Sequence, residues 1–70
     1  MKDLNTMTDR EWENALRRVR RAAAKDMHSI HKQRGGYGLM VVDANLNALV
    51  AGERFELDLN DVAEMFGVDI

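Results

Sequence analysis

The chain contains no cysteine and no proline, and its 70 residues include only one tryptophan, one tyrosine and two phenylalanines. Without cysteine the protein can form neither disulfides nor thiolate metal sites, and this composition fits a reducing compartment. No apolar run approaches the roughly 20 residues that span a bilayer. The first nine residues lack the apolar segment of a secretory signal. We therefore expect a cytoplasmic protein without membrane-spanning segments.

The length allows one small domain, which we place over residues 1–70. A chain of this size buries only about 60% of the surface of its unfolded form, so its stability is marginal without further help. Its composition, 46% hydrophobic and 31% charged, is nevertheless that of a folded domain. Because disulfides are excluded, oligomerisation is the remaining common way to add stability. We therefore expect a homodimer or a chain that acts bound to something larger.

The longest feature is an amphipathic segment predicted to be one helix over residues 8–34. Thr8 and Glu11 have the spacing of a capping box at its start, and Gly35 is suited to end it. Apolar residues recur at steps of three or four along the segment, as on one face of a helix. They are Trp12, Leu16, Val19, Ala23, Met27 and Ile30.

The second half of the chain predicts a β-hairpin over residues 38–57 and a short helix over residues 59–66. Two apolar runs, 39–42 and 48–51, flank a turn rich in Asp and Asn. Asp58 is the expected N-cap of the short helix, with Asp61 three residues later. The expected fold is α+β, with the long N-terminal helix packed on the hairpin and the short helix last (αββα).

This arrangement leaves a mismatch in length. A helix of about 26 residues measures roughly 39 Å, whereas strands of about five residues cover roughly 17 Å. We therefore expect the apolar face around Trp12, Leu16 and Val19 to lack a complete partner within the chain. Either residues 1–7 fold over it or a second molecule covers it, and in the second case Trp12 would be an anchor residue of the contact.

Charge is unevenly distributed, although the net charge is only −2. Residues 10–34 carry a balance of +5, and residues 35–70 a balance of −6. Two interpretations remain open at this point. Either the two halves neutralise each other within the fold, or one of them faces a charged partner.

No pattern of catalytic or metal-binding residues is present. His28 and His31 are three residues apart, but on the predicted helix both would lie on the polar side, with no further ligand placed beside them. No nucleophile–base pair can be argued either, and Asp58 and Asp61 are explained as helix-cap residues. We therefore expect a protein that is not an enzyme, with no metal and no cofactor.

The strongest functional candidate is the arginine-rich part of the long helix. We expect a small non-enzymatic regulator or inhibitor that binds another protein or protein complex. A phage or mobile-element protein that blocks host nucleic-acid machinery, as a host-defence antagonist does, would fit this size and charge distribution. The alternative is an RNA- or DNA-binding protein, because the stretch resembles arginine-rich helical motifs that bind RNA. The predicted partner-binding residues are Arg17, Arg18, Arg20, Arg21, Lys25, Lys32, Trp12 and Tyr37.

Overall fold

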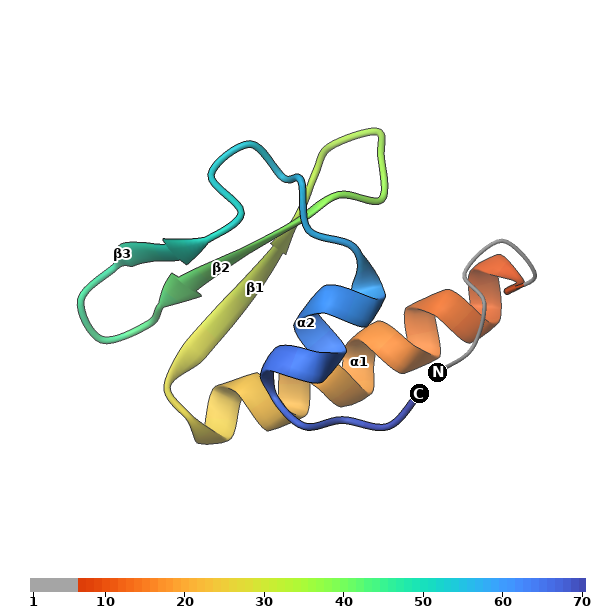
Figure 1. The fold of residues 1–70 in the computed structure, drawn as a ribbon, viewed down its shortest axis with the longest axis horizontal. Coiled ribbons are helices and arrows are strands. Elements are labelled where there is room, and N and C mark those ends of the chain that lie inside the picture. The colour runs from red at the N-terminus through yellow and green to blue at the C-terminus, as the bar shows by residue number, and fades with distance from the viewer. Residues whose placement is uncertain (1–6) are drawn as a thin grey trace.

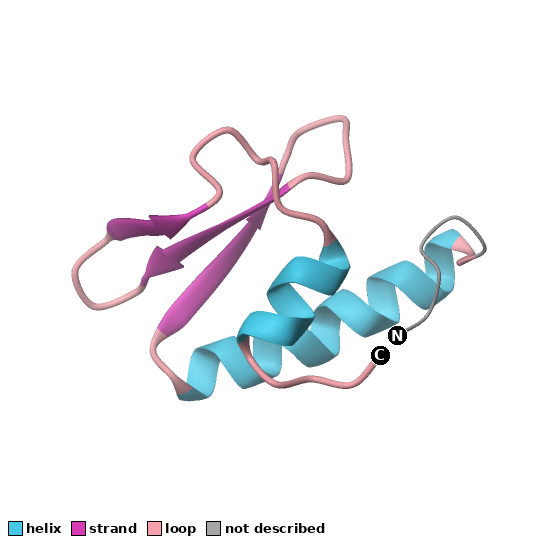
Figure 2. Cartoon of the chain, viewed as in Figure 1, coloured by secondary structure: helices cyan, strands magenta, loops and turns pink. Residues whose placement is uncertain are grey.

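The computed structural model describes residues 7–70, which form two helices and a three-stranded antiparallel sheet (Figure 1). Helix α1 (Asp9–Lys25) is followed by strands β1 (His28–Lys32), β2 (Leu39–Asp43) and β3 (Ala48–Ala51) and by helix α2 (Leu59–Met65). The strands lie in the order β1-β2-β3. Both helices pack on the same face of the sheet (Figure 2), so the expected α+β class is confirmed. No helix within residues 7–70 is long and apolar enough to cross a membrane.

The predicted start of the long helix is confirmed. Thr8 is the N-cap, and its hydroxyl accepts a hydrogen bond of 3.1 Å from the backbone N–H of Glu11. The Glu11 carboxylate accepts the backbone N–H of Thr8 in return, at 3.4 Å. This reciprocal pair satisfies two backbone donors that the first turn of a helix leaves without partners.

The predicted end of the helix at residue 34 is wrong. Helix α1 stops at Lys25, and Met27 adopts the left-handed conformation with φ of 60°. The chain then reverses into β1, whose residues pair antiparallel with β2 from His28 opposite Asp43 to Lys32 opposite Leu39.

The helical spacing of the apolar residues gave a wrong prediction here because Ile30 fits both the apolar face of the predicted helix and the buried face of the observed strand. In the structure Ile30 lies opposite Val41 in the sheet, and both side chains belong to the core. A third strand also removes a weakness of the predicted fold, since a two-stranded hairpin is only marginally stable. Long-range pairing with β2 therefore overrides the local helical pattern.

The apolar face of α1 is covered within the chain, so of the two expected arrangements the one that needs a second molecule is not required. Trp12 is 6% exposed, Leu16 1% and Val19 0%. The shorter helix, about 26 Å long for its 17 residues, is matched to the sheet and to α2. The three residues belong to one hydrophobic core, which consists of Trp12, Ala15, Leu16, Val19, Ala23, Ile30, Leu39, Val41, Leu59, Val62 and Ala63.

The predicted hairpin is confirmed as β2 and β3, joined by a turn in which the Asp43 carboxylate accepts the backbone N–H groups of Asn45 and Leu46. A β-bulge interrupts the pairing between Val41 and Val42. Beyond β3, Leu57 returns to form a single bridge with Leu39.

The short helix is also confirmed, one residue shorter than predicted. Asp58 and Asp61 form the expected reciprocal cap, with hydrogen bonds of 2.8 and 3.0 Å. Leu59, Val62 and Ala63 are fully buried against the rest of the core. Helix α2 thus covers the part of the sheet face that α1 does not cover.

Candidate binding surface

The solvent side of α1 carries a dense group of cations between residues 17 and 25. A helix advances by about 100° per residue, so these positions spread over the side opposite the buried stripe. All five side chains are exposed. We call this group the basic face; it consists of Arg17, Arg18, Arg20, Arg21 and Lys25.

The basic face has no ionic partner within residues 7–70: none of its five cations forms an ion pair there. Arg18 alone makes a hydrogen bond, in which its guanidinium Nη2 donates to the backbone carbonyl of Asp69 at 2.5 Å. The proposal that the two halves of the chain neutralise each other through direct contacts is therefore not supported. Instead, the arginines present unused donors to solvent.

Carboxylates limit the basic face at both ends of the helix. Glu13 lies one turn before Arg17, and Asp26 is the C-cap residue directly after Lys25; both are exposed. The uninterrupted basic stretch from Arg17 to Lys25 is therefore only about 12 Å long, at 1.5 Å per residue. The helix dipole favours Lys25 in the last turn, whereas it opposes the carboxylate of Asp26 at the C-cap.

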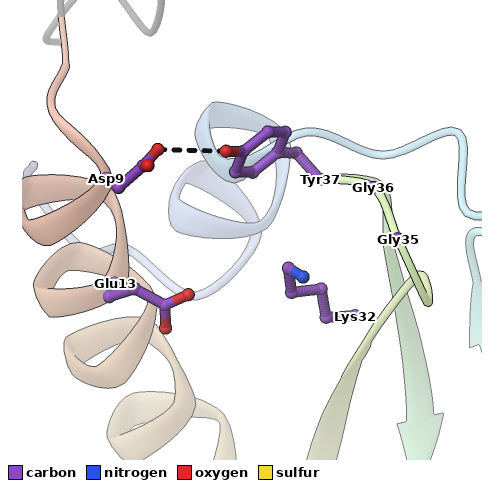
Figure 3. Close-up of a pocket in the computed structure, with 6 residues that line it drawn as sticks. All are labelled: Asp9, Glu13, Lys32, Gly35, Gly36 and Tyr37. Carbon is purple, nitrogen blue, oxygen red and sulfur yellow. Dashed lines mark hydrogen bonds between the residues drawn. The ribbon is translucent and has the colours of Figure 1, made fainter.

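Two of the predicted partner-binding residues, Lys32 and Tyr37, line a shallow pocket of about 260 Å³ beside the first turns of α1 (Figure 3). Tyr37 is 58% exposed, and its hydroxyl donates a hydrogen bond of 3.0 Å to Asp9. Its ring stands edge-on to Trp12, with centroids 5.1 Å apart. Lys32, now on β1, places its Nζ atom 5.8 Å from the centre of the Tyr37 ring.

Trp12 is the predicted site residue that the structure removes from the surface. With 6% exposure it belongs to the core, where its ring contacts the ring of Tyr37. Lys32 was predicted to share a helix face with the arginines, and that placement is wrong because residue 32 is in a strand. The basic face therefore consists of residues of α1 alone.

The pocket beside Tyr37 has a mixed electrostatic character. Asp9 and Glu13 line it from α1, whereas Lys32, Gly35 and Gly36 line it from β1 and the following loop. The hydrogen bond to Asp9 raises the pKa of Tyr37 above its ordinary value of 10.0, and the negative charges of Asp9 and Glu13 act in the same direction. Tyr37 therefore remains a neutral hydrogen-bond donor at physiological pH and is not an activated nucleophile.

The two histidines do not lie together as the helix prediction placed them. Side chains alternate along a strand, so His28 and His31 project from opposite faces of β1. His28 lies against Phe66, with ring centroids 5.5 Å apart, while His31 is exposed. Within residues 7–70 no group of three or more His, Cys, Asp or Glu side chains is arranged to hold a metal ion.

Sequence reasoning found the basic face because helical spacing separates exposed from buried positions within a single element. It missed the contact of Tyr37 with Asp9, which joins residues 28 positions apart.

Comparison with protein-family models finds no match, and comparisons with curated proteins and with solved structures find none either. The functional inference therefore depends on the surface of this chain alone.

Proposed function

We propose that the protein is a small non-enzymatic regulator or inhibitor that binds an acidic surface of another protein through the basic face of α1. The observation that carries this proposal is the absence of ionic partners for Arg17, Arg20, Arg21 and Lys25 within residues 7–70. Arginine is over-represented at protein interfaces and among residues that dominate binding energy. Its planar guanidinium also pairs with carboxylates through two parallel hydrogen bonds.

The rigidity of α1 supports this role. The helix is capped at its start and buried along one side, so the positions of its arginines are fixed before binding. Only the side-chain rotamers then remain to be ordered, which lowers the entropic cost of association. A partner with carboxylates spaced over about 12 Å would match the basic stretch.

The carboxylates at both ends of the basic face favour a compact protein patch over a polynucleotide. A nucleic-acid backbone that continued along α1 would meet Glu13 in one direction and Asp26 in the other. The chain as a whole carries a net charge of −2, which does not attract polyanions over long distance. An acidic patch confined to the middle of the helix avoids both sources of repulsion.

The biological setting of this proposal is a protein of a phage or other mobile element that acts in the cytoplasm and blocks host nucleic-acid machinery. This setting is supported by the small size, the lack of cysteine and the segregated charge. It is an analogy and not a motif match. The biochemical proposal, a protein partner for the basic face, does not depend on it.

The test is affinity capture of partners, followed by measurement of binding to the captured protein. We expect the double variant Arg17→Ala/Arg21→Ala to lose affinity by about tenfold to a hundredfold, as when two arginine contacts are removed from an interface centre. The matched control is Arg34→Ala/Arg54→Ala, which removes the same charge from exposed loop positions. Equal losses for the two double variants would contradict a specific role for α1.

Nucleic-acid binding through the same residues is the second candidate, favoured by five cations on one helix without an intervening acid. Its signature is salt dependence. With four to five phosphate contacts on duplex DNA, the logarithm of the binding constant should fall with a slope of about −4 against the logarithm of salt concentration. Tight binding to generic RNA or DNA with such a slope would replace the protein-partner proposal.

A further inference from the structure

Strand β3 forms an uncovered edge of the sheet. It pairs with β2 on one side, whereas the helices pack against β1 and β2 (Figure 1). Its residues Ala48, Leu49 and Val50 are all exposed. An edge strand leaves a row of backbone N–H and C=O groups without sheet partners, and such a row is a template for another strand.

The same edge is apolar. Leu46, in the turn before β3, is 76% exposed, and Leu49 and Val50 are each 48% exposed. We call these three residues the β3 patch. All three lie on the β3 edge or in the turn that leads into it, where their apolar side chains are open to a partner.

One residue of the β3 patch, Leu49, lies on the sheet face that the helices leave open. Leu49 lies opposite Val42 in the pairing of β3 with β2, so the two side chains share a face. Val41 belongs to the core on the helix side, and Val42 therefore points away from the helices. Val42 is only 9% exposed even so, which shows that its neighbours on this face already cover it.

The two edges of the sheet differ in charge. Strand β1 carries exposed His31 and Lys32, and a charged side chain on an edge strand, lysine above all, opposes pairing with another chain. Strand β3 carries no charged side chain at all. Charge therefore protects the β1 edge, whereas only the short length of β3 and the bulge in its pairing limit the β3 edge.

We propose that two copies of this chain associate through antiparallel pairing of their β3 strands, which joins two three-stranded sheets into one of six strands. A two-fold axis through the pairing makes the contact self-complementary, and no like charges are brought together by residues 48–51. The protected β1 edges then close the assembly as a dimer, because a filament would need pairing at both edges. This inference does not depend on the proposed function of α1.

The size of the contact predicts a weak dimer. The β3 patch and the strand backbone supply less than the roughly 800 Å² per partner of a standard interface. The bulge between Val41 and Val42 further limits the regular part of the edge. We expect a dissociation constant on the order of tens of micromolar, weaker than the micromolar to picomolar range of standard-sized interfaces.

Sedimentation equilibrium from about 5 to 300 µM, a range chosen around that expected constant, tests the proposal. The full chain should shift from its monomer mass of 8.0 kDa towards twice that value. Val50→Lys should weaken association at least about tenfold by placing a charge at the edge. The control Met65→Lys, an equal change at a side chain that is 45% exposed on α2, should leave association unchanged.

Two further experiments test whether the two copies meet at their β3 strands. An equimolar mixture of Val50→Lys and Val50→Glu should regain association, because the two-fold axis brings the two copies of residue 50 close together. Since the chain has no cysteine, Val50→Cys should form a disulfide-linked dimer on oxidation much faster than Met65→Cys. The cysteine variants also decide the question where circular dichroism shows that a charged variant is unfolded.

A monomer mass throughout the concentration range would overturn the proposal. Dimerisation that Val50→Lys leaves intact, a mixture of charged variants that stays monomeric, or equal cross-linking of both cysteine variants would also overturn it. Oligomers that grow beyond the dimer would show that the β1 edge is not protected.

Discussion

Removal of two methyl groups at Val19 tests whether the apolar face of α1 is satisfied within one molecule. Val19 is completely buried, in the middle of the helix and of the core. Val19→Ala removes about 1.6 kcal/mol of transfer free energy, at about 0.8 kcal/mol per methylene-sized group. The space left behind adds a cavity contribution, so the total loss in free energy of unfolding should be about 2.5 kcal/mol. The helix itself should not oppose the change, since alanine has the highest helix propensity.

The assay is chemical denaturation followed by fluorescence. Trp12 is the only tryptophan and is 6% exposed in the same core, so its emission reports loss of the packing that the mutation perturbs. A domain of this size has a total stability of roughly 3.5–10 kcal/mol, so the midpoint should fall by a quarter or more. Because Val19 has partners only within its own chain, the loss should not depend on protein concentration.

The control is Met65→Ala, which truncates a side chain that is 45% exposed on α2 and lies outside the proposed strand pairing. There the loss should stay below about 1 kcal/mol, because surface substitutions usually change stability only slightly. A loss below about 1 kcal/mol at Val19, or one that shrinks as the protein is diluted, would refute the conclusion that α1 is fully covered by its own chain.

Three other predictions follow from single contacts. The phenol of Tyr37 should titrate above pH 10.0, and in the variant Asp9→Asn its pKa should lie closer to 10.0, as measured by ultraviolet absorbance. Because the pKa is raised in the folded state, the associated stability is present below pH 10 and is lost as the pH rises through the folded value. Thr8→Ala should lower the free energy of unfolding by about 1 kcal/mol, because the first turn of α1 loses its cap; an unchanged denaturation midpoint would contradict this. Gly38→Ala should cost well over 1 kcal/mol, since its new Cβ would lie 2.1 Å from the Phe55 carbonyl oxygen and the backbone must shift; a variant as stable as the parent would show that this loop adapts freely.

Local signals predicted those parts of the fold whose stabilising contacts are close in sequence. The caps at Thr8 and Asp58 are built by partners three residues away, and both were identified from the sequence. The β2–β3 hairpin is also local, with turn residues between two apolar runs. In each case the pattern and the physical cause lie within the same short segment.

The end of α1 could not be predicted in this way because its cause is distant. Strand β1 contains a single large apolar residue, Ile30, and is specified by pairing with residues 39–43. The reversal before it uses Met27 in a left-handed conformation, for which glycine would have been the recognisable signal. Gly35 provided that signal eight residues after Met27. The contact between Tyr37 and Asp9 was missed for the same reason.

The corrected end of α1 also changes which surfaces are available to partners. The apolar stripe around Trp12 is closed, and the basic face is confined to α1 before Asp26. The apolar edge of β3 belongs to a different element, which leaves the solvent side of α1 out of the proposed strand pairing (Figure 1). A dimer formed through β3 would therefore present two basic faces fixed on one continuous sheet. Binding of the first face would raise the effective concentration of the second, so a weak dimer would amplify affinity for a partner that carries two acidic patches, without any new contact.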